Sequence, residues 1–278
     1  NLENCIKFPD DVLKFIIKEY TLEAGVRKLK EKLFEIIGEL NLTLFNEFEH
    51  ISIPIILTEE NIKNNYFKDK RENKLVYIHS TPTIGMINAL WANEMGQGGI
   101  LPLQVNFYPT NSFLDLKLTG SLGDVMKESI NVSVTIAWNL CTKEKQAELT
   151  EKYNDSKNRR VFGLHIHCPS ISTKKDGPSA TTAFTVIIYS LFNNIPIKNN
   201  FGITGETSFD YKLTEIGGLR EKIVFSIPSG ITDFIFPKEN KKDFDKILEK
   251  YKDNNLFDGI NFFDLENISE VLDMILDK

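Results

Sequence analysis

The first forty residues carry apolar side chains at the spacing of amphipathic helices. Pro9 and Asp10 mark the start of a short helix whose apolar residues are Val12, Leu13, Phe15 and Ile16. A second helix is predicted to begin at a Thr21 cap and to carry an apolar stripe formed by Leu22, Val26, Leu29, Leu33, Ile36, Ile37 and Leu40. Because such stripes need a partner, the two helices indicate a small helical unit.

The pattern between residues 41 and 83 is less regular. Residues 51–57 favour a strand, and residues 58–67 favour a short helix capped by Thr58. The polar run that follows at 68–74 is typical of a linker. We therefore predict a domain boundary near residues 65–80, with a helical subdomain over 1–70 and a larger domain over 75–278.

Beyond residue 75 the pattern alternates between strands and helices. Strands are predicted at 84–92 and 101–107 around a GQGG turn, and at 114–118, 161–168, 202–215 and 232–236. Ser121 and Asp124 fit the capping box of a long helix that continues past Ile136, and the charged stretch 143–160 is predicted to be a solvated helix end and loop. Further helices are predicted at 180–192, 219–227, 240–251 and 267–277. This order predicts an α/β (α+β) fold.

Composition narrows the classes of function. Of the 278 residues, 41% are hydrophobic and 26% are charged, the balance of a soluble globular protein with a sizeable core. The net charge of −6 argues against a surface dominated by nucleic-acid or membrane binding, although a local basic patch is compatible with DNA. Cys5, Cys141 and Cys168 are too scattered for a disulfide framework and favour a reducing interior. No apolar run approaches the ~18 residues of a membrane span, no signal peptide is recognisable, and a start at Asn1 is typical of a fragment or a processed chain.

The stretch KKDGPSA at 174–180 contains the first candidate for chemistry. It has the composition of a helix start, in which Asp176 can act as the cap. Ser179 is then either an ordinary serine of the first turn or a nucleophile. The free amides at a helix N-terminus would stabilise the oxyanion that such a nucleophile generates.

Two sets of residues are candidates for the base. His165 and His167 share one face of the predicted strand and are candidates for the base; they can also supply two ligands of a zinc site. Neither a carboxylate for a catalytic triad nor a third zinc ligand is recognisable. The plainer interpretation is therefore that they are two polar strand residues. Lys222 follows a Gly-Gly pair within an apolar flank. Burial that lowers its pKa from about 10.4 would supply a neutral amine for a serine proton; the alternative is a lysine on a helix surface.

Several motifs, taken in order, resemble the C-terminal part of the Lon proteases, the ATP-dependent Ser–Lys peptidases. The resemblance spans about residues 20 to 244 and rests on YTLEAGVRKL, ALW with GQGG, LTGSLGDVMKES, LHIHCP, KKDGPSA, GITGE, EIGGLREK and FPKENKKDF. It implies a Lon-type proteolytic domain after a small helical subdomain. By resemblance Ser179 is the nucleophile and Lys222 the general base, and the supporting or oxyanion residues are Thr204, Asp176, Gly177 and Ala180.

The resemblance also implies partners and cofactors. Unfolded or damaged polypeptides are the expected substrates, a homohexamer is the expected assembly, and no metal or membrane is expected. The N-terminal helices resemble the end of an AAA+ ATPase module, in which Arg27 matches the nucleotide sensor. Because the sequence has no G-x-x-x-x-G-K-[ST] phosphate loop, ATP and Mg²⁺ are expected only for the full-length protein. An intracellular location, cytoplasm or mitochondrial matrix, is implied. The alternatives are a catalytically silent Lon-like assembly module and a DNA-associated module.

The sequence departs from the usual family pattern in four places. Lys174 stands where proline is common, Thr181 follows Ala180 in place of glycine, Asp210-Tyr211 stands in a turn that usually contains glycine, and Glu215 replaces a proline. Thr181 is the departure nearest the candidate nucleophile. It is expected either to narrow the substrate cleft or to pack within the helix.

Overall fold

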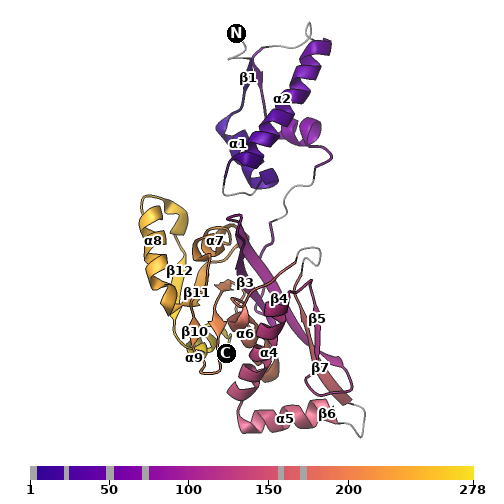
Figure 1. Ribbon diagram of the computed structural model, residues 1–278, viewed down its shortest axis with the longest axis vertical. Helices are drawn as coiled ribbons and strands as arrows, with labels where there is room; N and C mark the ends of the chain where they lie inside the picture. Colours follow the sequence, from indigo (N-terminus) through magenta and orange to yellow (C-terminus); the bar gives the residue numbers. More distant parts are fainter. Residues whose placement is uncertain (1–4, 22–24, 48–52, 71–74, 156–159, 170–173) are drawn as a thin grey trace. The chain divides into compact units, whose positions relative to one another are not determined.

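A computed structural model describes residues 5–21, 25–47, 53–70, 75–155, 160–169 and 174–278. The chain divides into two compact units, one formed by residues 1–75 with 94–97 and the other by residues 76–93 with 98–278. Figure 1 shows both units. Among the helices in the described ranges, none combines the length and the apolar character needed to cross a membrane.

The first unit is mainly helical. Its elements are β1 (Ile6–Lys7), α1 (Asp10–Ile16), a π-helical turn η1 (Ile17–Thr21), α2 (Arg27–Glu47), β2 (Ile55–Ile56), α3 (Glu59–Asn61) and a second π-helical turn η3 (Ile62–Tyr66). The predicted stripe on α2 is confirmed in part, because Ile36 and Leu40 are buried against α1, whereas Val26 is exposed. Thr58 caps α3 as predicted.

The prediction that Thr21 caps the second helix is wrong. The Thr21 hydroxyl donates to the carbonyl of Ile17, which makes this threonine the end of η1. The helix α2 begins only at Arg27, and the predicted stripe residue Leu22 lies outside the described residues. A threonine whose hydroxyl bonds back four residues serves the turn before it, and α2 begins six residues further on.

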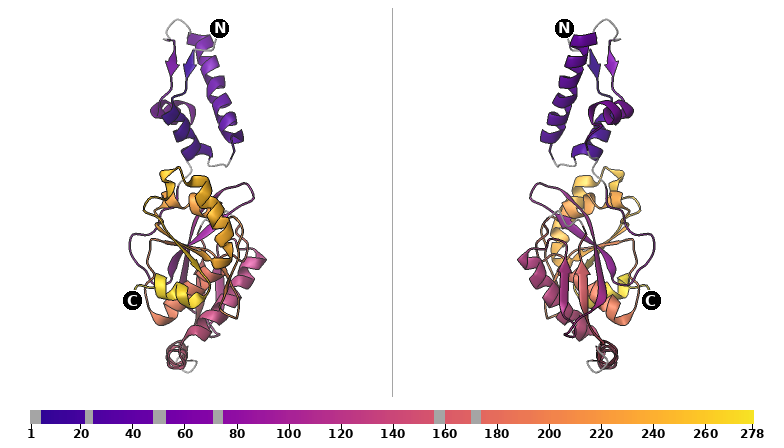
Figure 2. Two further views of the ribbon diagram at one scale, coloured as in Figure 1. Left: turned by 90° about the vertical axis from the view of Figure 1, so that its left-hand side faces the viewer. Right: turned by 90° about the vertical axis from the view of Figure 1, so that its right-hand side faces the viewer.

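The second unit is built on a mixed sheet, which Figure 2 shows from two sides. The strand order is β12-β11-β8-β3-β4-β7-β5, with β6 paired to β7 outside this path. Its strands are β3 (Met86–Ala92), β4 (Gly98–Pro109), β5 (Leu116–Thr119), β6 (Asn154–Asp155), β7 (Arg160–His167), β8 (Phe201–Ile203), β11 (Asp233–Pro237) and β12 (Asn261–Leu265), while β9 (Glu206–Thr207) and β10 (Leu213–Thr214) form a separate hairpin.

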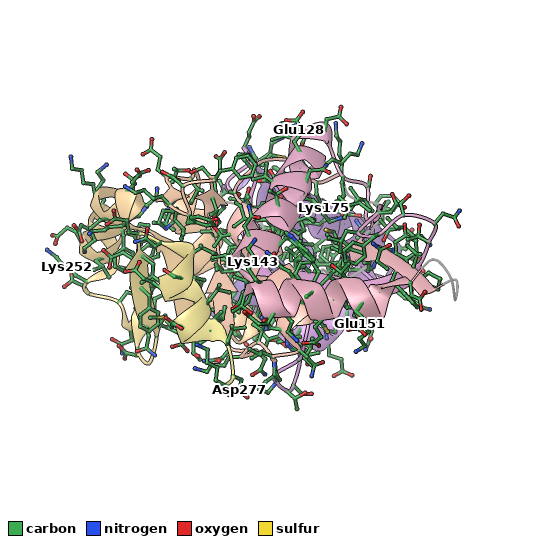
Figure 3. All side chains as sticks on the ribbon, turned by 90° about the horizontal axis from the view of Figure 1, so that it is seen from below. Glu128, Lys143, Glu151, Lys175, Lys252 and Asp277 are labelled. Carbon is green, nitrogen blue, oxygen red and sulfur yellow. The ribbon has the colours of Figure 1, made fainter. Side chains whose placement is uncertain are left out.

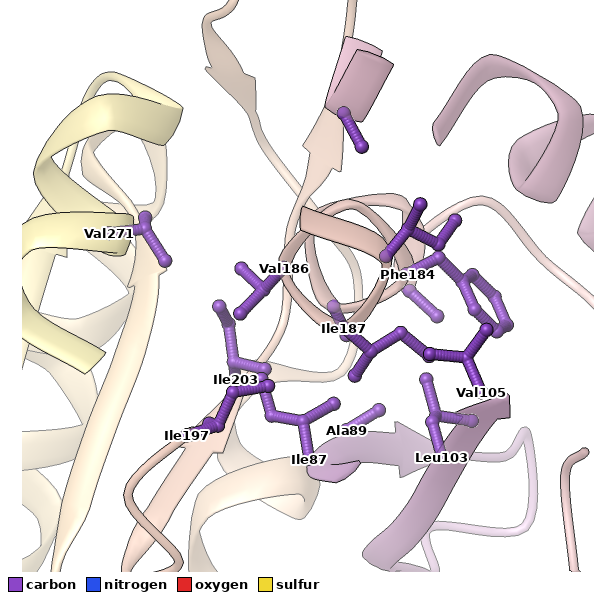
Figure 4. Close-up of a cluster of buried hydrophobic side chains, with 14 of the residues drawn as sticks. Ile87, Ala89, Leu103, Val105, Phe184, Val186, Ile187, Ile197, Ile203 and Val271 are labelled. Atoms are coloured by element: carbon purple, nitrogen blue, oxygen red, sulfur yellow. The ribbon is translucent and has the colours of Figure 1, made fainter. Parts of the chain in front are cut away.

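Helices cover both faces of this sheet. One core contains buried residues of α4 (Asp124–Leu140), α6 (Thr181–Asn193) and α9 (Ile268–Ile275), and the other contains residues of α7 (Leu219–Val224) and α8 (Lys241–Tyr251). Alternation along β3 separates the two cores, since Ile87 and Ala89 enter the first and Leu90 enters the second. Figure 4 shows α6 lying over β3 and β4 with its apolar side chains between them. The observed mixture confirms the predicted α/β (α+β) class.

Three details of the second unit differ from the sequence prediction. Gly123, not Ser121, precedes α4, because Ser121 has a positive φ of 58°. The stretch from Lys143 to Tyr153 is a separate helix, α5, capped by Thr142 and exposed along most of its length, as Lys143 and Glu151 in Figure 3 illustrate. The edge strand β12 was not anticipated, because half-exposed residues blur its alternation. Short helical turns connect other elements at η4 (Ile227–Ser229), η5 (Lys238–Asn240) and η6 (Asn255–Phe257).

The turn between β9 and β10 contains a strained residue. Tyr211 has a φ of 67°, the left-handed conformation that glycine adopts without a side-chain clash. Its amide donates to Ser208 and its carbonyl accepts from Ile268, so both neighbours hold the conformation in place.

We expect Tyr211→Gly to be more stable than Tyr211→Ala by about 1 kcal/mol, the reverse of the usual order, because only glycine relieves the left-handed strain. Both variants lose the same ring contacts, so their difference isolates the backbone. Chemical denaturation of the two proteins measures it. An alanine variant as stable as the glycine variant would contradict the strain.

Candidate active site

Ser179 lies in the turn that leads into α6, and its side chain is half-buried. The segment before it is fixed to the start of α4 by two backbone hydrogen bonds. The Lys175 amide donates to Ser121 at 3.0 Å, and the Gly123 amide donates to the Lys175 carbonyl at 2.7 Å. The loop that carries the candidate nucleophile therefore follows the frame of the sheet and α4.

The carbonyl oxygen of Ser179 is held from the opposite side by the end of β8. It accepts hydrogen bonds from the Gly205 amide at 2.9 Å and from the Thr204 hydroxyl at 3.2 Å. The Thr182 amide in turn donates to Gly205 at 3.1 Å. These bonds join the GITGE segment to the start of α6, which the sequence separates by more than twenty residues.

Lys222 reaches the same place from the other face of the sheet. It lies in α7, whose preceding residue Gly218 adopts a left-handed φ of 69°. A Cβ at Gly218 would lie 2.8 Å from the Cβ of Ala92, so glycine lets α7 pack closely against β3. The Lys222 side chain is 3% exposed, and its Nζ donates to the Thr204 hydroxyl at 3.0 Å.

Burial lowers the pKa of Lys222 to about 8. With this pKa about a tenth of the amine is neutral at pH 7, compared with roughly one molecule in 2,500 for a free lysine. Among the described residues, Lys222 and the Ser179 hydroxyl share no direct hydrogen bond. Thr204 connects the Lys222 amine to the backbone of Ser179, because its hydroxyl accepts from Lys222 and donates to the Ser179 carbonyl.

Two amides beside the candidate nucleophile have no acceptor among the described residues. Within the described part of the chain, no group accepts a hydrogen bond from the Ser179 or the Ala180 amide, whereas the Thr181 amide donates to Pro178. Both open amides precede α6, where the helix dipole favours negative charge. This arrangement fits a site for an oxyanion.

Asp176 supports this site from a position that the sequence did not indicate. One of its carboxylate oxygens accepts from the Met126 amide at 3.1 Å and from the Gly177 amide at 3.0 Å. The carboxylate therefore caps α4, not the helix that follows it in sequence. A Cβ at Gly123 would lie 2.1 Å from this carboxylate, so glycine is needed there. Gly177 has a φ of 113° and open space beside it.

Thr181 packs within its helix. It is 2% exposed, and both its amide and its hydroxyl donate to the Pro178 carbonyl, at 3.0 and 2.6 Å. Its own carbonyl accepts from Ser133 on α4. The side chain therefore does not narrow the cleft, and it tightens the turn that contains Ser179.

The two histidines of β7 lie on the sheet face opposite Leu164 and Ile166, as predicted. His165 and His167 both contact the Thr119 hydroxyl, at 3.1 and 2.8 Å. The described residues contain no group of three or more histidine, cysteine, aspartate or glutamate side chains arranged for a metal ion. The histidines thus have a local partner on β5 and no hydrogen bond to Ser179.

Asn240 is a positioning residue that the sequence reasoning missed. Its side chain accepts from the Ile216 amide at 3.0 Å and donates to the Ile216 carbonyl at 2.9 Å. It is 2% exposed and fixes the segment that leads into α7 and Lys222. An asparagine within an otherwise charged motif, FPKEN, was the available signal.

Arg27 lies at the start of α2, far in sequence from Ser179, Thr204 and Lys222. Its guanidinium pairs with Glu31 at 3.2 Å, and its side chain is 89% exposed. The described residues around it do not form a phosphate-binding loop, so they do not make a nucleotide site by themselves.

Comparison with known proteins agrees with this geometry. Residues 57–278 match the family model of the Lon protease (S16) C-terminal proteolytic domain, and residues 2–40 match the Lon protease AAA+ ATPase lid domain. The chain belongs to the Lon protease family.

Curated Lon relatives cover nearly the whole chain. The Lon protease of Buchnera aphidicola is 34% identical over 99% of this chain, and that of Fervidobacterium nodosum is 31% identical over 99%. A Lon protease homolog of Acanthamoeba polyphaga mimivirus is 30% identical over 96%. The chain covers 33%, 31% and 31% of these relatives, so it spans about a third of their length.

Local backbone contacts accommodate two of the residues that depart from the Lon pattern. Tyr211 takes the left-handed conformation expected of the usual turn glycine. Glu215, unlike a proline, has an amide, and this amide donates to Glu239 at 2.8 Å. Neither change touches the bonds that join Ser179, Thr204 and Lys222.

We expect Asp176→Ala to lower the free energy of unfolding by about 1 kcal/mol, because the capped amides of α4 lose their acceptor. Asp176→Asn keeps an acceptor oxygen and should lose less. Thermal or chemical denaturation compares the two variants. Equal losses in both would show that the carboxylate acts by its charge and not as a cap.

Proposed function

We propose that Ser179 and Lys222 form a catalytic dyad that hydrolyses peptide bonds. The single observation that carries this proposal is the Thr204 hydroxyl, which bonds both the Lys222 amine and the Ser179 backbone. The lowered pKa of Lys222 supports the role of base, and membership of the Lon family supports the reaction class. Among the described residues, nothing favours the alternative of a silent or DNA-associated module.

The chemistry follows from these contacts. The neutral Lys222 amine takes the proton of the Ser179 hydroxyl as its oxygen attacks the carbonyl carbon of the substrate. The amides of Ser179 and Ala180 stabilise the oxyanion. The Lys222 ammonium then gives its proton to the leaving amine. Water then attacks the carbonyl carbon of the acyl-enzyme and loses a proton to Lys222, which returns that proton to the Ser179 oxygen as the acyl group is released.

The larger assembly is also part of the proposal. We infer that residues 1–70 form the helical end of an AAA+ module and residues 75–278 the proteolytic domain. ATP and Mg²⁺ act in the full-length protein, where Arg27 senses the nucleotide, and a homohexamer feeds unfolded or damaged polypeptide to the dyad. The family match to an ATPase lid supports this arrangement. Its expected location is intracellular, in the cytoplasm or the mitochondrial matrix.

Ser179→Ala and Lys222→Met should each abolish cleavage of an unfolded protein such as casein by the 278-residue chain. In the wild-type chain, kcat/KM should rise with pH up to about 8 and then level off, because only the neutral amine acts as base. A serine-directed probe should label wild type and not Ser179→Ala. If either variant cleaves like wild type, or wild type neither cleaves nor is labelled, the dyad is wrong.

The same lysine should limit stability. Since its pKa is lowered on folding, the unfolded chain binds more protons between about pH 8 and pH 10.4, and stability rises with pH across that window. Below this window the folded chain carries the full cost of a buried cation. Lys222→Met should therefore raise the free energy of unfolding at pH 7 by about 3 kcal/mol and remove this pH dependence. A Lys222→Met variant with a lower free energy of unfolding than wild type at pH 7 would contradict a free-energy cost of burying the Lys222 ammonium.

Thr204→Val should lower kcat about 10²-fold or more and change the pH profile, because the amine loses its acceptor and its position. Thr204→Ser, which keeps the hydroxyl, should restore most activity with the wild-type profile. The measurement is kcat against pH for both variants and wild type. If valine keeps the wild-type profile and kcat, Thr204 is only a packing residue.

A further inference from the structure

A cavity of about 480 Å³ is lined in part by the segment just before Ser179, and all of its lining residues belong to the second unit. Its walls are mainly apolar, with three charged residues along one side. The lining residues are Val76, Trp91, Ala92, Asn93, Ile100, Leu101, Met126, Lys174, Lys175 and Asp176.

The cavity is attached to both members of the proposed dyad. On one wall, Asp176 is bonded to the Met126 amide, and the chain continues from Asp176 to Ser179 within three residues. On the other wall, Ala92 packs against Gly218, the residue before the helix of Lys222. The cavity is thus lined by the segment that leads to Ser179 and by a residue that contacts the start of α7.

The three charges on the wall differ in their partners. The Lys175 amine donates to the Gly120 carbonyl at 3.0 Å, and the Asp176 carboxylate accepts from two backbone amides. The Lys174 side chain is exposed and makes no hydrogen bond or ion pair with any residue that the structure describes. The positive charge of Lys174 also acts on Asp124. The pKa of Asp124 is lowered mainly by the hydrogen bond from Lys127 and to a smaller extent by the charge of Lys174.

We propose that Lys174 determines substrate specificity: the cavity holds an apolar side chain of the polypeptide, and the ammonium of Lys174 selects an acidic residue close to it in the substrate sequence. This inference rests on the proposed peptidase function and adds a substrate class to it. An exposed ion pair of this kind changes kcat/KM by about two- to fivefold and weakens at high salt.

The test uses fluorogenic peptides with one cleavable leucine and a single variable residue, glutamate or lysine, moved through the flanking positions. In the wild-type chain the Glu/Lys ratio of kcat/KM should reach about two- to fivefold at one flanking position and fall with added salt. Lys174→Gln should bring this ratio to about one, and Lys174→Glu should invert it. A ratio unchanged in Lys174→Glu overturns the proposal.

Lys252→Gln is the matched control. It removes one positive charge from an exposed lysine that pairs with Glu249, and Figure 3 shows Lys252 well apart from Lys175. This variant should keep the wild-type ratio. If it lowers the ratio as much as Lys174→Gln does, the selection comes from net charge and the proposal fails.

A binding measurement separates this proposal from the proposed reaction. The Ser179→Ala chain should bind the glutamate peptide about two- to fivefold more tightly than the lysine peptide by fluorescence anisotropy, and Lys174→Glu in the same background should reverse the order. A preference in binding without cleavage by wild type would contradict only the dyad. Cleavage without any preference would contradict only the role of Lys174.

Discussion

A buried amine next to one threonine hydroxyl is the interaction on which the candidate site of the second unit depends. Lys222 is almost fully enclosed, and its nitrogen finds one acceptor, Thr204, among the described residues. Enclosing an ammonium costs free energy, which the surrounding apolar core of α7 and α8 offsets. The cost and the proposed reactivity have the same origin, because the burial that destabilises the cation also increases the fraction of neutral amine.

The sheet topology explains why three distant segments meet at this hydroxyl. Thr204 follows β8 directly, at the end of a strand buried between β3 and β11. The turn of Ser179 arrives from the face covered by α4 and α6, and α7 brings Lys222 from the opposite face. A residue at a strand end is open to both layers, so one side chain can bond a group from each.

Regular periodicity and local motifs allowed much of the fold and the candidate dyad to be predicted from sequence. Strands β3, β4 and β7 and helix α6 have strong alternation or a continuous apolar stripe, and the motifs around Ser179 and Lys222 are continuous in sequence. The capping of α4 by Asp176 was missed because it joins residues fifty positions apart. Helix α5 was missed because Leu149 is its single buried residue among those described, so it shows almost no stripe.

The residues that depart from the Lon pattern fall into two groups, according to whether they make local contacts or line the cavity. Thr181 is enclosed and bonds the turn of Ser179, and Tyr211 and Glu215 satisfy their own backbone, so these changes leave the dyad contacts intact. Lys174 differs from the other departures because it places a charged side chain on the wall of the cavity, at a position where the family commonly has proline. The bonds that join Lys222, Thr204 and Ser179 do not pass through Lys174, so the proposed specificity can change while the contacts of the proposed dyad stay intact.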